Sequence, residues 1–103
     1  MRRYDLSPLA NDDLRSIWSY IGERNSVAAD KVIDKFYSVF VSLASQPGMG
    51  QTAPYAENLK QFPCGRYVVY FRRLDDNSAM IEIVRVIHGS RNAGTVTFGE
   101  PDE

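Results

Sequence analysis

Two amphipathic helical patterns follow each other between residues 7 and 45, separated only by the short stretch 22–25. In the first pattern, Ser7 is a good N-cap and Pro8 suits the first helical position. Its apolar stripe recurs at helical spacing and is expected in the core; it consists of Leu14, Ile17, Trp18 and Ile21. Because the link to the second pattern is so short, the two helices are expected to form an antiparallel hairpin.

The second pattern begins at Ser26, which is placed to cap it, and ends before Pro47 and Gly48. Its apolar stripe consists of Ala29, Val32, Ile33, Phe36, Val39 or Phe40, and Leu43. The stretch that follows, residues 46–58, is rich in Gly and Pro and predicts a loop over the surface.

Three strand patterns come after this loop, at about residues 59–63, 67–73 and 79–87, and a brief edge strand is expected at 2–6. The short connections between the last three favour an antiparallel meander. The chain therefore predicts the order β-α-α-β-β-β, an α+β domain with a helical hairpin packed on a small antiparallel sheet. The middle strand carries large apolar groups on both faces, so the second face is expected to stay open for a partner.

A length of 103 residues suits one domain, which we place at residues 1–92, followed by an acidic and flexible tail at 93–103. Cys64 is the only cysteine, so no intramolecular disulfide can form, and a cytoplasmic protein is expected. A lone cysteine is most often a small buried apolar residue. The longest uninterrupted apolar run, residues 67–71, is far too short for a membrane span, and no membrane partner is expected.

The net charge of −1 is distributed unevenly along the chain. Residues 59–91 carry six basic and three acidic side chains, whereas residues 92–103 carry three acidic ones. Proteins that bind nucleic acid through phosphate contacts usually have a clearly basic domain. The charge distribution therefore favours a protein partner, and no sequence-specific binding of nucleic acid is expected.

The segment IEIVRVIHGSRN, residues 81–92, contains the only histidine of the chain, His88, between Arg85 and Arg91. An RNA-cleaving site that uses no metal needs a group that transfers protons and cations that stabilise negative charge. His88 is a candidate for the first role, and Arg66, Arg85 or Arg91 for the second.

The alternation of a straight strand argues against this site. Arg85 would share one face with Ile83 and Ile87, whereas His88 would share the other face with Val84. The two candidate side chains would then project away from each other, unless the strand breaks at His88.

Structural roles explain the same residues. Arg85 is able to pair with Glu82 or with an acidic residue of a helix, and His88 is able to bond to the nearby turn. One histidine and one cysteine, His88 and Cys64, do not make a four-ligand zinc site, and their spacing does not indicate a thiolate pair. No metal and no cofactor are expected.

Taken in order, four segments resemble the ParE toxins of the RelE/ParE superfamily, which belong to bacterial type II toxin–antitoxin modules. These segments are LSPLANDDLRSIWSYIGERNSVAADKVIDKF, LASQPGMGQ, FPCGRYVVYFR and IEIVRVIHGSRN. The resemblance spans about residues 4–92 and implies the same β-α-α-β-β-β fold. It also implies a toxin that acts by binding DNA gyrase and trapping it on cleaved DNA, a link to plasmid stabilisation, and neutralisation by a cognate ParD-like antitoxin in a hetero-oligomer.

The family motifs also suggest site residues. Arg66, Tyr67, Arg85, His88 and Arg91 match motif positions and are candidates for target or antitoxin binding. The antitoxin would fold as it binds, on the outer groove of the helical hairpin and on the exposed sheet face. Two alternatives stay open. One is a ribosome-dependent mRNA endonuclease of RelE type that uses Arg66, Arg85 and His88, and the other is an inactive homologue that only binds antitoxin.

Overall fold

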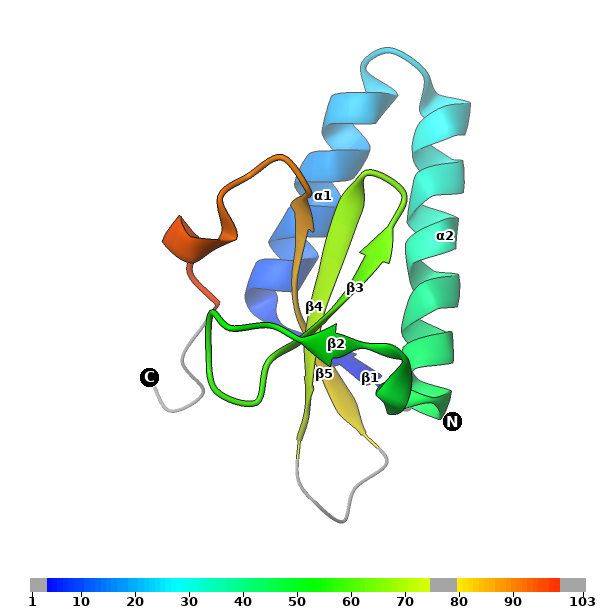
Figure 1. The fold of residues 1–103 in the computed structure, drawn as a ribbon. Coiled ribbons are helices and arrows are strands. Elements are labelled where there is room, and N and C mark those ends of the chain that lie inside the picture. The colour runs from blue at the N-terminus through cyan, green and yellow to red at the C-terminus, as the bar shows by residue number, and fades with distance from the viewer. Residues whose placement is uncertain (1–3, 75–79, 99–103) are drawn as a thin grey trace.

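The computed structural model describes residues 4–74 and 80–98, with two helices on one face of a five-stranded sheet (Figure 1). The elements in chain order are β1 (Tyr4–Leu6), α1 (Pro8–Gly22), α2 (Ser26–Ser45), the 3-10 turn η1 (Pro47–Met49), β2 (Gln51–Thr52), β3 (Lys60–Cys64), β4 (Tyr67–Arg73), β5 (Ile81–His88) and the 3-10 turn η2 (Ala93–Thr95). The predicted α+β architecture, with a helical hairpin packed on a sheet, is confirmed. The predicted order gains one short strand, β2.

The first helix begins at the predicted cap. The Ser7 hydroxyl oxygen accepts a hydrogen bond at 3.0 Å from the N–H three residues on, and Pro8 opens α1. The cap of α2 is Asn25 rather than the expected Ser26, because the Asn25 side chain accepts from the Ala28 N–H at 3.0 Å. Asn25 has the extended backbone that a cap needs, whereas Ser26 already belongs to the helix.

Trp18 lies at the surface, contrary to the expectation that it packs in the core. Its side chain is 45% exposed, and its Nε1–H donates to Asp30 Oδ1 of α2 at 3.0 Å. The buried residues of α1 are Ala10, Leu14 and Ile17. Trp18 is turned about 100° further round the helix than Ile17. The indole therefore links the two helices on the solvent side.

The sheet has the order β1-β5-β4-β3-β2 and is mixed, not wholly antiparallel as predicted. β3, β4 and β5 form the expected antiparallel meander. β1 runs parallel to β5, with Tyr4 opposite Ile81 and Leu6 opposite Ile83. A parallel pair is possible here because the helical hairpin, and not a tight turn, follows β1. The sequence does not reveal β2, since two residues make no periodic pattern.

Strand β5 contains a bulge at Val84. Its neighbours Ile83 and Arg85 pair with consecutive residues of β4, so Val84 has no partner across the ladder. The extra residue changes the alternation of faces: Ile83 and Val86 face the helices, whereas Val84 and Ile87 face the other side. The expectation that Ile83 and Ile87 share a face is therefore wrong, because it assumed a regular strand.

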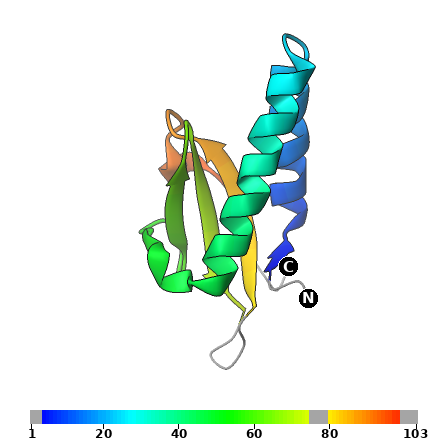
Figure 2. The same cartoon turned by 90° about the vertical axis from the view of Figure 1, so that its right-hand side faces the viewer.

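Buried residues form two clusters, one on each face of the sheet. The first cluster lies between the sheet and the helices, and its largest fully buried side chains are Phe36, Phe40, Leu43, Val69, Phe71, Ile81 and Ile83. The second cluster consists of Ala53, Leu59, Tyr70, Val84, Ile87, Ala93 and Phe98. Figure 2 shows the helices on one side of the sheet, and the segments before β3 and after β5 on the other. The expectation that this second face is open is therefore wrong, because residues 53–59 and 93–98 cover it.

Residues 93–98 belong to the segment that was expected to form a flexible tail, but they pack on the sheet. Ala93 and Phe98 are 8% and 9% exposed. The physical reason is that the second apolar face needs a cover that the helical layer cannot supply. The remaining tail residues, 99–103, lie outside the described residues, as do residues 2, 3 and 79 of the expected strands.

Candidate partner-binding groove

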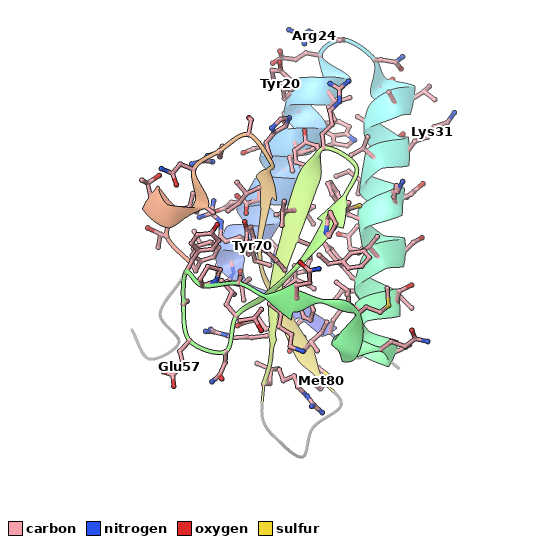
Figure 3. All side chains as sticks on the ribbon, in the orientation of Figure 1. Tyr20, Arg24, Lys31, Glu57, Tyr70 and Met80 are labelled. Carbon is pink, nitrogen blue, oxygen red and sulfur yellow. The ribbon has the colours of Figure 1, made fainter. Side chains whose placement is uncertain are left out.

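A groove of about 940 Å³ lies between the hairpin end of the two helices and the turn that joins β3 to β4. Its floor is apolar and includes Ile17, Ile21, Val32, Phe36 and Cys64. Its polar lining includes Tyr20, Arg24, Lys35, Arg66, Tyr67, His88 and Arg91. Figure 3 shows Tyr20 and Arg24 at the hairpin end of α1. Four of the five predicted site residues, all except Arg85, thus meet in one groove.

Two turns carry the basic residues of the sheet to the groove. Gly65 has a φ of 61°, a left-handed conformation that glycine adopts easily, and Arg66 follows it. In the turn after β5, the Gly89 N–H donates to the Arg66 carbonyl at 2.8 Å. A Cβ at position 89 would lie 3.3 Å from that oxygen, so glycine permits the close approach. The turns that hold Arg66 and Arg91 are therefore bonded to each other.

Tyr67 and His88 are partners across β4 and β5, and their rings meet edge-on with centroids 5.3 Å apart. Tyr67 also meets Phe36 of α2 edge-on at 5.4 Å. The Nδ1 of His88 accepts a hydrogen bond from the Ser90 N–H at 3.1 Å and lies 2.8 Å from the Ser90 Oγ. Because Nδ1 accepts from the Ser90 N–H, Nε2 is the ring nitrogen that remains able to donate. The predicted bond of His88 to the nearby turn is confirmed.

The groove combines an apolar floor with a cationic rim. Among the described residues, no carboxylate lines it, and its cations are Arg24, Lys35, Arg66 and Arg91. The ion pairs found within residues 4–74 and 80–98 join Arg72 to Glu82 and Arg85 to Asp13, and these lie elsewhere. This arrangement is complementary to an amphipathic segment with acidic side chains.

Arg85 lies outside the groove, against α1. Its Nε and Nη2 donate to Asp13 at 2.7 and 2.8 Å, and its Nη1 donates to the Thr97 carbonyl at 2.6 Å. The hydrogen bond to Asp13 raises the pKa of Arg85 above its ordinary value, although burial acts in the opposite direction. Arg85 is therefore a permanent cation held in place. The predicted pairing with an acidic helix residue is confirmed, whereas Glu82 pairs with Arg72 instead.

Asp13 also completes a stretch of strand edge. β1 covers β5 only as far as Ile83. Beyond that point, Asp13 Oδ2 accepts the Val86 N–H at 2.9 Å, and the Ser7 hydroxyl donates to the Val84 carbonyl at 2.7 Å. Two side chains therefore satisfy backbone groups that a longer β1 would have paired. An acidic residue near a helix start is normally explained by the helix dipole, so the sequence does not reveal this role.

Tyr20, Arg24 and Lys35 line the groove although no motif in the sequence points to them. Tyr20 lies in the last turn of α1 and Arg24 in the link to α2, and the Arg24 guanidinium carbon lies 4.9 Å from the centroid of the tyrosine ring. Lys35 follows Val32 by three positions on α2. This spacing is the available signal, but it does not tell which part of the sheet these helix faces meet.

Cys64 is buried in the floor of the groove, as predicted for a lone cysteine. Burial raises the pKa of its thiol above the ordinary value of 9.0, while Lys35 acts in the opposite direction. Tyr67 pairs with Cys64 on one side and with His88 on the other. The thiol and the imidazole thus come from strands that flank β4, which favours a structural role for Cys64 over a thiolate pair.

In the part of the chain that the structure describes, His, Cys, Asp and Glu side chains do not gather in groups of three or more that could hold a metal ion. No helix in the same ranges is long and apolar enough to cross a membrane.

Comparison with known proteins adds three likenesses. Residues 4–93 match the family described as ParE toxin of type II toxin-antitoxin system, parDE. Toxin ParE1 of Caulobacter vibrioides is 36% identical over 99 residues, which cover 90% of this chain and 95% of the relative. A solved structure described as the chromosomal ParDE TA system from P. aeruginosa has a TM-score of 0.67 at 17% identity, and the match covers 85% of this chain and 96% of that one. This last likeness concerns the fold.

Proposed function

Because this chain belongs to the ParE toxin family of type II toxin–antitoxin systems, we propose that it stops growth by binding DNA gyrase and trapping it on cleaved DNA. We propose further that a cognate ParD-like antitoxin neutralises it in a toxin–antitoxin hetero-oligomer in the cytoplasm. Both steps are binding events, so neither requires the toxin to act as an enzyme.

The composition of the groove is the observation that carries the proposal of a protein partner. Its floor offers apolar side chains such as Ile21, Val32 and Phe36, and its rim offers cations. A segment that folds as it binds would bury its apolar face on this floor and place acidic side chains at the rim. We expect an acidic amphipathic helix of the antitoxin in this groove. The other docking surface predicted for it, the second sheet face, is occupied by residues 53–59 and 93–98.

The endonuclease alternative has less support. It assigns roles to Arg66, Arg85 and His88, but Arg85 is held by Asp13 and does not line the groove that contains the other two. The Nδ1 of His88 is engaged by Ser90.

A supercoiling assay tests the gyrase target. Relaxed plasmid is incubated with purified gyrase and increasing amounts of the purified chain. We expect supercoiling to stop and linear DNA to accumulate after detergent and protease treatment. Normal supercoiling at a large molar excess would contradict the gyrase target. Codon-linked cleavage of mRNA on ribosomes by the same preparation would instead support the endonuclease alternative.

Two serines on the helices provide a matched test of the antitoxin site. Ser16 is exposed and lines the groove, whereas Ser38 is exposed and lies outside it. Each is replaced by cysteine in a Cys64→Ala chain, and the rate of thiol labelling is measured with and without the product of the neighbouring antitoxin gene. We expect protection of Ser16→Cys and no change for Ser38→Cys. Equal labelling of both in the complex would place the antitoxin elsewhere.

A further inference from the structure

Residues 93–98, here called the strap, cover part of the second sheet face. Phe98 stacks on Tyr55 with ring centroids 6.0 Å apart and meets Tyr70 edge-on at 4.9 Å. Phe98 belongs to the second cluster together with Tyr70, Val84 and Ile87. The strap therefore shields apolar side chains of β4 and β5 from water.

The backbone of the strap is bonded mainly to its own residue Ala93 and to the adjacent Asn92. Three of its N–H groups donate to Asn92 or Ala93, at distances from 3.0 to 3.2 Å. Among residues 4–74 and 80–98, the hydrogen bond that joins the strap to a part of the domain beyond the adjacent Asn92 runs from Arg85 Nη1 to the Thr97 carbonyl, at 2.6 Å. Outside this bond, side-chain packing holds the strap in place.

The second segment on this face, residues 53–59, is held differently. The Ala53 N–H donates to the Leu59 carbonyl at 2.9 Å, and these two residues are 1% and 2% exposed. The segment also joins β2 to β3, which pair with each other in the sheet. Opening this segment would disturb the sheet, whereas opening the strap breaks the hydrogen bond from Arg85 and the packing of Ala93, Val96 and Phe98. Segments with so few attachments open at a lower free energy than the strands beneath them.

We propose that the strap is a detachable cover, latched by Arg85 and Phe98, which opens while the rest of the domain stays folded and then exposes Tyr70, Val84 and Ile87. Asp13 holds the Arg85 guanidinium from the other side, so the latch stays in position when the strap leaves.

Two adjacent residues of β5 provide a matched test. Ile87 lies under the strap at 3% exposure, and Val86 lies on the helix side at 2%. Each is replaced by cysteine in a Cys64→Ala chain, and thiol labelling is measured under native conditions. We expect labelling at position 87 to be at least about tenfold faster than at position 86, because it needs only local opening. Phe98→Ala should accelerate labelling at position 87 by about tenfold more and leave position 86 governed by global unfolding.

Equal labelling rates at the two positions, both matching the rate of global unfolding, would overturn the proposal, as would an equal effect of Phe98→Ala on both. A second measurement needs no substitution under the strap. Thermolysin cleavage within residues 93–98 of the unsubstituted chain should depend only weakly on urea, since strap opening exposes little surface. A urea dependence as steep as that of global unfolding would contradict a detachable strap. Neither measurement depends on gyrase or on an antitoxin.

Discussion

The carboxylate of Asp13 and the guanidinium of Arg85 form a two-point hydrogen bond, at 2.7 and 2.8 Å, across a sequence separation of 72 residues. The same carboxylate accepts the Val86 N–H, and the same guanidinium donates to the Thr97 carbonyl. One ion pair therefore joins α1, the uncovered edge of β5 and the strap. These contacts explain why Arg85 of β5 stabilises the fold and does not line the groove.

Removing one partner of this pair should be strongly destabilising. The side chains of Arg85 and Asp13 are 12% and 13% exposed, so Asp13→Ala leaves a nearly buried cation and the Val86 N–H without their acceptor. We expect the free energy of unfolding, measured by urea titration, to fall by about 3–5 kcal/mol. Asp12→Ala, at an exposed neighbouring position, is the control and should change it by less than about 0.5 kcal/mol. Similar decreases in the free energy of unfolding for the two substitutions would show that the Asp13–Arg85 ion pair does not stabilise the fold appreciably.

Reversing the charge of the groove rim should weaken the antitoxin complex. The double variant Arg66→Glu, Arg91→Glu places two carboxylates where an acidic partner segment is expected. We expect the dissociation constant, measured by calorimetry, to rise by at least about tenfold, with a weaker dependence on salt. Arg73→Glu reverses an exposed charge that does not line the groove and should leave affinity nearly unchanged. Equal losses from both would indicate a general effect of net charge.

Gly50 should not tolerate a side chain. A Cβ there would lie 2.5 Å from Cζ of Phe71, a ring that is fully buried in the first cluster. Gly50→Ala should therefore force the ring or the β2 backbone to move and lower the free energy of unfolding by about 1–3 kcal/mol. Gly48→Ala is the matched control, because its Cβ would meet no atom within 4 Å. Thermal unfolding of both variants measures the difference, and a Gly50→Ala chain as stable as the control would contradict the packing described for Phe71.

The domain should lose stability in alkali through two buried groups. Burial raises the pKa of Cys64 and of Tyr70 above their ordinary values of 9.0 and 10.0. Folding favours the neutral thiol and the neutral phenol. Their contribution to the free energy of unfolding is therefore complete below the pKa of each group in the unfolded chain, and it is lost as the pH rises through the pKa in the folded chain. We expect the free energy of unfolding to decrease between about pH 9 and pH 11, and to decrease less in Cys64→Ala and Tyr70→Phe. An equally steep decrease in the double variant would assign the effect to other groups.

Much of the fold could be predicted because its signals are local. The Ser7 cap and the Pro47 stop bound the helical hairpin, and each acts within one helical turn. The bounds of β4 follow from its own run of alternating large apolar residues. The burial of Cys64 follows from its residue type. Four of the five site residues that the family resemblance implied line one groove in the structure, and their role in binding stays a prediction.

Other features depend on segments that meet only after folding. Val84 forms a bulge because the register between β4 and β5 shifts by one residue there, and no local sequence pattern predicts this shift. Asp13 selects Arg85 as its partner because α1 crosses the uncovered edge of β5. The strap packs on the sheet because the second apolar face needs a cover.

The sequence by itself determined the hairpin and the meander, since hydrophobic periodicity and capping act between near neighbours. Only the tertiary structure decided that Arg24 and Lys35 complete the groove, that Arg85 leaves it, and that the second face is closed. The pairing of charged side chains and the cover of the second sheet face depend on how segments distant in the sequence are arranged in space. Local periodicity carries no information about that arrangement.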